Sequence, residues 1–264
     1  MRAFVVAVFA FLYLPIFLVV LFSFNAGHHA SEMTGFSLQW YRKLFSDPDW
    51  LDSLITSVQI MLPTGIIATA FGTAAAFGIA RGRFPGAAII SSVLMAPLVV
   101  PVIITAAALY GLFGGLGLNG TLGGFILAHT VLTIPYVAAT VLAALRVLDE
   151  QLEKAALTLG ATYWSAFWRV VFPLILPAIL SGFLFAMIIS FDELVVSLFI
   201  SSPILRPVTV KMWSDIRGDV NPTISAIGSL IFLFSLVVLL AESLLRGRWR
   251  EGGPDLASTE GPIQ

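Results

Sequence analysis

Long apolar stretches separated by short polar segments make up most of the chain. Six of them are long enough to cross the hydrocarbon core of a bilayer, which takes about 20 helical residues. Backbone amides in lipid must pair within their own segment, so each stretch is predicted to be a transmembrane helix. The pattern therefore predicts an all-α membrane protein, whose spans lie approximately at residues 4–24, 54–80, 87–113, 122–145, 174–200 and 223–241.

These six spans form one predicted domain over residues 1–250, and a polar, turn-rich tail follows at 251–264. The composition of the tail is typical of a disordered segment. The third span holds Pro97 and Pro101, which together remove two backbone donors and should kink that helix.

The orientation follows from the basic residues that flank the spans, because cytoplasmic segments carry an excess of Lys and Arg. With the N-terminus in the cytoplasm, the inner segments hold Arg2, Arg81, Arg83, Arg146, Lys154, Arg169, Arg246, Arg248 and Arg250. The outer segments then hold Arg42, Lys43, Arg206, Lys211 and Arg217. This bias predicts that both termini are cytoplasmic.

Composition narrows the functional classes. Apolar residues make up 58% of the chain and charged residues 11%, against about 25% charged in a typical globular protein. A net charge of −1 gives no reason to expect nucleic acid as a partner. The chain has no cysteine, which excludes disulfides and thiolate chemistry.

The predicted outer segment Asn25–Ser53 is rich in aromatic residues, namely Trp40, Tyr41, Phe45 and Trp50. Aromatic rings prefer the headgroup level of a membrane, so the segment should contain a short interfacial helix. It serves either as an aromatic belt or as a contact for a partner protein.

Residues 148–172 connect the fourth and fifth spans and have a helical apolar pattern. Gly160 can take a positive φ and end a first helix, and Thr162 can cap a second. Pro173 suits the first turn of the next span. The sequence thus predicts a helix–Gly–helix elbow that projects from the membrane, as a surface for a partner or as an ordinary interfacial elbow. Its apolar face comprises Leu148, Leu152, Ala155, Ala156, Leu159, Tyr163 and Phe167.

Within this elbow, the run Glu153-Lys154-Ala155-Ala156-Leu157-Thr158-Leu159-Gly160-Ala161, followed by Pro173 and Pro177, resembles the EAA loop of type I ABC importer permeases. One position departs, since Lys154 stands where the family has glutamate and Glu153 comes one residue earlier. The resemblance implies coupling to a separate ATPase through Glu153, Lys154, Ala155, Ala156 and Gly160.

The resemblance also implies that the subunit is not an enzyme. The chain has no Gly-x-x-x-x-Gly-Lys-Ser/Thr loop of its own. ATP and Mg²⁺ would belong to the partner ATPase, and the chain itself would hold no cofactor and no metal.

Three further segments, at 13–25, 129–137 and 190–199, resemble the second permease subunit of spermidine/putrescine importers. This implies a multi-pass subunit of the bacterial inner membrane, surrounded by lipid. Its partners would be a homologous second permease, two ATPase subunits and an external substrate-binding protein. The expected substrate is a small amine, and the alternatives are an amino acid, an opine-like compound or an aminophosphonate. A passive channel or an intramembrane enzyme is a remote alternative.

Asp192 and Glu193, in the fifth span, are the candidate functional residues of the transmembrane region. An acid at the centre of a membrane helix costs about 2.5–3.5 kcal/mol, so such acids usually line a pathway. Adjacent helical positions point about 100° apart. We expect one acid, Asp192, to line the pathway beside Phe191 and the other to brace a neighbouring helix. An ion pair with Lys211 or Arg206, or a cap for a broken helix, would also explain them.

His129 is the remaining ionisable residue within a span, in the fourth. A single His without a second ligand at helical spacing predicts a hydrogen bond between helices rather than a metal site.

Overall fold

The computed structural model describes residues 1–27, 35–82, 85–218 and 222–251. Within these ranges the chain is helical, apart from connecting loops and one isolated bridge between Asn25 and Phe36. The polar tail of 252–264 lies outside the described residues. The helices are α1 (Arg2–Ser23), α2 (Gln39–Ser46), α3 (Pro48–Arg81), α4 (Ala87–Val99), α5 (Val102–Leu116), α6 (Leu122–Val147), α7 (Glu150–Thr158), α8 (Tyr163–Ala166), α9 (Phe172–Asp192), α10 (Val195–Ile200), α11 (Val208–Gly218) and α12 (Thr223–Glu251), with a π-helical turn at Phe167–Val171.

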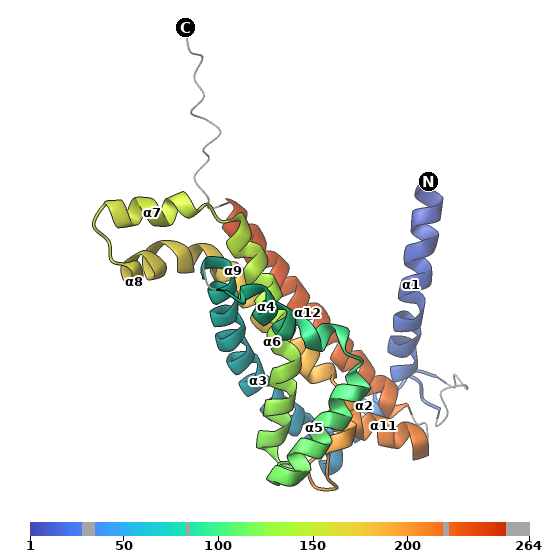
Figure 1. Ribbon diagram of the computed structural model, residues 1–264. Helices are drawn as coiled ribbons and strands as arrows, with labels where there is room; N and C mark the ends of the chain where they lie inside the picture. Colours follow the sequence, from blue (N-terminus) through green and yellow to red (C-terminus); the bar gives the residue numbers. More distant parts are fainter. Residues whose placement is uncertain (28–34, 83–84, 219–221, 252–264) are drawn as a thin grey trace.

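Among the described residues, five helices are long and apolar enough to cross a membrane, and the bent pair α4–α5 would make a sixth span. Figure 1 shows the start of α1, the elbow α7–α8 and the end of α12 at one end of the molecule, with α2, α5 and α11 at the other. This arrangement agrees with the alternating sides predicted from the sequence.

The centre of the molecule is a bundle of α3, α6 and α9. These helices approach closely because Gly72 of α3 and Gly182 of α9 both face Val137 of α6. A Cβ built on Gly72 would lie 2.7 Å from Val137 Cβ, and one on Gly182 would lie 3.1 Å from its Cγ1. Small residues at helix contacts are the usual means of close packing in membranes.

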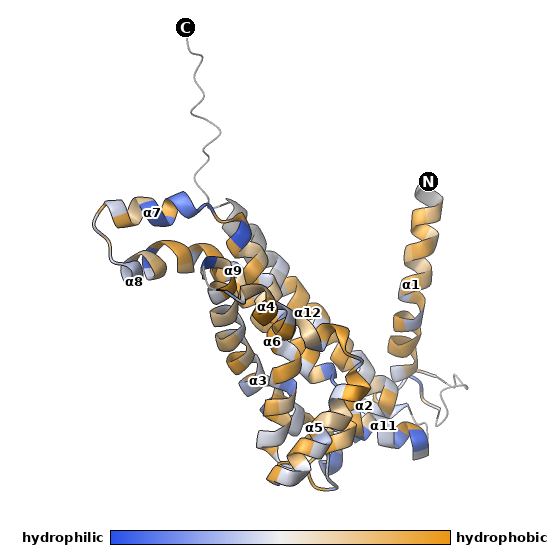
Figure 2. Cartoon of the chain, in the orientation of Figure 1, coloured by the Kyte–Doolittle hydropathy of each residue, from blue (hydrophilic) through white to orange (hydrophobic). Residues whose placement is uncertain are grey.

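The first helix, α1, stands apart from this bundle (Figure 1) and meets α12 near its outer end. In the most apolar 18-residue window of its span, Phe4–Ser23, no residue is buried in the chain. Figure 2 shows hydrophobic colouring along most of its length. A helix that is apolar all round and is left largely uncovered by its own chain is suited to lipid or to another membrane subunit.

Two spans are interrupted. The kink predicted from Pro97 and Pro101 is present, but it is a full break, because α4 and α5 meet at 103° around Val100. The fifth span ends as a regular helix at Asp192, and the shorter α10 continues after Glu193 and Leu194. Residues up to Ile200 therefore do not extend α9, contrary to the expectation of one continuous helix over 174–200.

Candidate functional site

The elbow is built by local capping, as the sequence predicts. Gly160 has φ +89°. Its N–H donates to the carbonyl of Leu157 (3.0 Å), and Ala161 N–H donates to the carbonyl of Ala156 (3.1 Å). This pair of bonds is the Schellman arrangement, in which a glycine after the last turn satisfies carbonyls at the helix end.

The neighbouring helix starts are capped as well. Asp149 Oδ1 accepts a bond from Gln151 N–H (2.9 Å) at the start of α7. Thr162 Oγ1 accepts one from Ser165 N–H (3.2 Å) at the start of α8, which confirms the predicted cap. Pro173 lies in the first turn of α9, also as predicted.

The first limb of the elbow, α7, has no buried residue among those described. Leu152 of α7 is 47% exposed and Leu159, directly after the helix, is 89% exposed, whereas Leu157 is half-buried. Ala155 beside them is also exposed and presents no bulk. A short helix with outward apolar side chains at one end of the molecule is suited to contact a partner protein.

The second limb is held by aromatic side chains. Phe167 packs edge-on against Phe77 of α3, with ring centroids 5.1 Å apart, and Trp168 lies 4.7 Å from Phe172. A cavity of about 620 Å³ lies between this limb, α3 and α9. Its lining is mostly apolar, with Thr69, Thr73 and Tyr163 as the residues that carry hydroxyls, and it includes no charged side chain.

The departure of Lys154 from the family motif has a structural counterpart. Lys154 Nζ lies 3.5 Å from Glu150 Oε2 and is largely exposed, whereas Glu153 turns toward Arg81 at the end of α3. The acid one position earlier therefore faces its own bundle, and a cation occupies the outer position.

At the other end of the molecule, the two acids of the fifth span have different surroundings. Glu193 Oε1 accepts a bond from Val196 N–H (2.7 Å), and the Glu193 carbonyl accepts one from Thr209 Oγ1 (3.1 Å). Glu193 therefore caps α10 across the break, which is one of the alternatives that the sequence left open.

Asp192 is exposed and lines a cavity of about 450 Å³. Within the described ranges Asp192 forms no ion pair. Lys211, one of the partners that the sequence suggested, pairs with Asp215 instead, and its Nζ lies 2.8 and 3.0 Å from the two carboxylate oxygens. Phe191 points away, into the core against Phe234 of α12, with ring centroids 5.3 Å apart. The other lining residues are Leu194, Thr209, Met212, Trp213, Ile216, Gly228 and Ile231.

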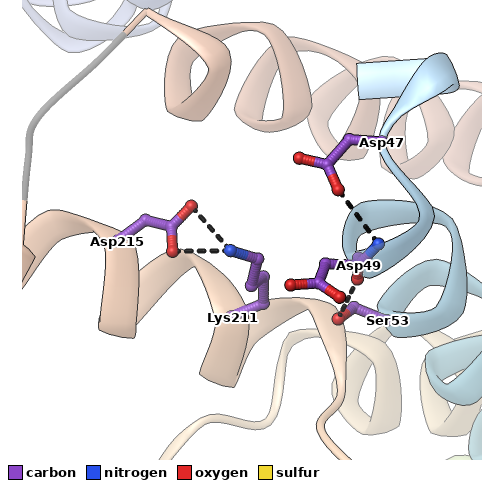
Figure 3. A network of polar contacts seen from close by, with 5 residues as sticks. All are labelled: Asp47, Asp49, Ser53, Lys211 and Asp215. Carbon is purple, nitrogen blue, oxygen red and sulfur yellow. Dashed lines mark hydrogen bonds and ion pairs between the residues drawn. The ribbon is translucent and has the colours of Figure 1, made fainter. Parts of the chain in front are cut away.

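The outer aromatic segment contributes to this region, which the sequence did not show. Trp50 and Trp40 are buried, and the ammonium of Lys211 lies 5.1 Å from the Trp50 ring centroid. Figure 3 shows Asp47 and Asp49 on the side of α3 that faces the Lys211–Asp215 pair. The helix start is thus acidic and borders α11, whose side chains line the cavity.

His129 joins three helices at the break. Its Nδ1 lies 2.9 Å from Ser190 Oγ of α9, and its Nε2 lies 3.0 Å from Ser197 Oγ of α10. The ring is 1% exposed, and the predicted interhelical hydrogen bond is confirmed. In the described part of the chain, no group of three His, Cys, Asp or Glu side chains could hold a metal ion.

Comparison with known proteins gives a consistent result. A family model described as "Binding-protein-dependent transport system inner membrane component" matches residues 68–251. The chain is 32% identical to the spermidine/putrescine transport system permease protein PotC of Haemophilus influenzae, over 92% of this chain and 95% of that protein. It is 36% identical to the putrescine transport system permease protein PotI of Escherichia coli, over 84% and 82%.

Among solved structures, the chain resembles one in a bacterial ABC transporter involved in the import of the acidic polysaccharide alginate, with a TM-score of 0.68. The match covers 94% of both chains at 14% identity. At that identity the likeness concerns the fold alone.

Proposed function

Because the chain belongs to the family of binding-protein-dependent transport system inner membrane components and is a non-catalytic permease subunit of an ABC importer, we propose that it carries a small amine of the spermidine and putrescine class. The two relatives named for such amines match over most of the chain. The alternative is another small solute, such as an amino acid, an opine-like compound or an aminophosphonate, carried by the same machinery.

The observation that carries this proposal is the carboxylate of Asp192, which lines the cavity between α9, α11 and α12 and forms no ion pair with any described residue. A carboxylate forms charge-assisted hydrogen bonds with an ammonium group. Trp213 lines the same cavity, and an indole face attracts cations. Arg217 already lies 4.9 Å from that ring, so an incoming ammonium would have to use the other face of the indole or replace the guanidinium.

Glu193 has the bracing role in this proposal. Its carboxylate is engaged with the backbone of α10, so the break in the fifth span is maintained while Asp192 stays free for the solute. Phe191 supports the same break from the core side through Phe234.

We also propose the partners and the coupling step. A homologous second permease completes the pathway, two ATPase subunits with ATP and Mg²⁺ dock at the elbows, and an external binding protein delivers the solute. Nucleotide closes the ATPase pair, the elbows move together and the permease halves rock, which is a two-state equilibrium biased by ATP. Glu153, Lys154, Ala155, Ala156 and Gly160 are the proposed coupling residues, and both termini are proposed to be cytoplasmic.

The test is ATP-driven uptake by the complete importer in liposomes, supplied in turn with spermidine, putrescine, a neutral amino acid and an aminophosphonate. We expect uptake of the amines, and a loss of about tenfold or more in Asp192→Asn, since an amide lacks the charge that attracts an ammonium in a site of low dielectric. Asp52→Asn makes the same chemical change at an exposed position of α3 that does not line the cavity, and as the matched control it should retain uptake.

Solute binding by the external protein should be the same with every variant. Uptake of the amines at the wild-type rate by Asp192→Asn would refute the proposal that Asp192 attracts a cationic solute along the pathway. Preference for the amino acid or the aminophosphonate would favour the alternative.

A further inference from the structure

The last residue of α3, Arg81, reaches across to the first turn of α7. Its Nη1 lies 2.7 Å from Glu150 Oε1, and its Nε lies 3.7 Å from Glu153 Oε2. Glu150 and Glu153 are three residues apart, so they share one face of the short helix. One guanidinium therefore lies against two carboxylates of the elbow.

Arg81 is set for this contact by its surroundings. Its side chain is 20% exposed, and its Nε and Nη2 atoms are shielded from solvent without a hydrogen-bond partner in the described part of the chain. Only Nη1 comes within hydrogen-bond distance of a carboxylate of α7. The contact is therefore mainly an electrostatic attraction between one cation and two acids.

The same face of α3 also holds the other limb of the elbow. Phe77 lies four residues before Arg81, one turn away on the helix, and packs edge-on against Phe167 at 5.1 Å. Both limbs of the elbow are thus attached to the last turns of α3.

At its other end, α3 reaches the wall of the Asp192 cavity. Ser57 Oγ accepts a bond from Val208 N–H (2.8 Å) at the start of α11, and the next residue, Thr209, lines the cavity. A single helix of 34 residues therefore runs from the elbow to that wall, and Gly72 on it packs against Val137 of the bundle.

We propose that Arg81 is the positioning residue that fastens the coupling elbow to α3, so that a displacement of α7 moves α3 and the outer wall of the pathway with it. The inference rests on the proposed coupling to an ATPase. Without Arg81, α7 would be held to the bundle only by its chain connections and the aromatic second limb, and its displacement would be partly lost in local bending.

A partly exposed ion pair contributes little to folding stability, so Arg81→Gln should assemble. Mutation of a residue that carries coupling between sites typically changes the coupling by about twofold to thirtyfold. We therefore expect the amount of amine imported per ATP hydrolysed to fall by about that factor in Arg81→Gln. Arg81→Lys keeps the positive charge, and its import ratio should therefore lie closer to that of the wild type than the ratio of Arg81→Gln does.

Arg146 offers a matched control. It lies in the last turn of α6, at the same end of the molecule. It is exposed and forms no ion pair with any described residue. Arg146→Gln removes the same charge from that end and should leave the import ratio at the wild-type value.

A distance measurement between α3 and the elbow distinguishes loss of the Arg81 contact from a general loss of stability. Because the chain has no native cysteine, spin labels on Gly78→Cys in α3 and Leu159→Cys after α7 report the distance between the two elements. A Cβ at Gly78 meets nothing within 4 Å, and Leu159 is exposed. The distance distribution should broaden in Arg81→Gln and Arg81→Glu and should narrow again in Arg81→Glu/Glu150→Arg.

A wild-type import ratio together with an unchanged distance distribution in Arg81→Gln would overturn the inference. So would equal broadening in the single and the charge-reversed double variant. If the wild-type importer moves no amine, the proposed substrate is wrong. The spin-label distances would still decide whether Arg81 fastens the elbow.

Discussion

The conformation of Gly160 gives the sharpest test of the elbow. The residue has φ +89°, and a Cβ built there would meet nothing within 4 Å. Any penalty for a side chain at this position therefore comes from the backbone conformation and not from a collision. Substituting residues that tolerate a positive φ to different degrees isolates that conformation.

The left-handed conformation costs an L-residue about 1–2 kcal/mol, and for a β-branched residue it is a genuine outlier. Asparagine visits the region far more readily and is found at this helix position. Since 1.4 kcal/mol is about a factor of ten in an equilibrium constant, Gly160→Val should depopulate the present elbow by about tenfold. Gly160→Asn should leave most of it in place.

The assay is amine uptake and ATP turnover by the complete importer in liposomes, measured for wild type, Gly160→Asn and Gly160→Val. We expect the import ratio to follow that order, with about a tenfold loss in Gly160→Val and a melting temperature close to that of the wild type. A wild-type ratio in Gly160→Val would show that the turn between α7 and α8 has no part in coupling. Equal losses in Gly160→Asn and Gly160→Val would show that polarity or bulk matters there, rather than φ.

Four further outcomes test other parts of the molecule. A reporter fused after Gly82 should read cytoplasmic and one after Asn119 external, and the opposite readings would invert the orientation. Glu193→Ala should lower the melting temperature through loss of a cap worth about 1 kcal/mol, and Glu193→Gln, which keeps an acceptor, should lower it less. Gly72→Leu should destabilise by about 1–3 kcal/mol through overpacking against Val137, and a wild-type melting temperature would contradict the close packing. His129→Leu should cost about 1–3 kcal/mol by stranding two buried hydroxyls, and adding Ser190→Ala and Ser197→Ala should recover part of it.

The elbow could be predicted from the sequence because its determinants are local. A glycine after the last turn and a threonine before the next helix act through hydrogen bonds between residues at most five apart. The same holds for Pro173 at the start of α9. No distant residue has to be known for such motifs to be recognised.

The breaks in the third and fifth spans could be predicted only in part. Pro97 and Pro101 indicate that a helix is disturbed, but the 103° bend depends on what the second half packs against, which is α10 from a distant part of the chain. Likewise, the Asp192–Glu193 pair marks an unusual point in a span without assigning the two roles. The cap of Val196 by Glu193 is local, but the bond from Thr209 and the place of Asp192 in a cavity with α11 and α12 follow from the tertiary fold.

Arg81 could not be found from the sequence at all, apart from its value as an orientation signal. Its partners lie about 70 positions later in the chain, and a basic residue at the inner end of a span is expected in any membrane protein. The departure from the family motif at Lys154 likewise depends on contacts between distant parts of the chain. With Glu153 and Glu150 both turned toward α3, a cation at the next position neutralises the outer side of the acidic turn, and the family's glutamate is absent from the surface that an ATPase would meet.

That rearrangement has a consequence for recognition. The exposed surface of α7 and the residue after it combines the Lys154 ammonium and its partner Glu150 with the apolar Leu152, Ala155 and Leu159. An ATPase that docks there would meet an ammonium beside apolar side chains, so its complementary groove should present a carboxylate or a carbonyl where family members with glutamate need a cation. Charge reversal by Lys154→Glu should then weaken retention of the cognate ATPase on the purified permease pair, whereas Lys154→Met should weaken it less. Retention that is stronger with Lys154→Glu than with the wild type would mean that the groove keeps the family's cation and that Lys154 is tolerated rather than recognised.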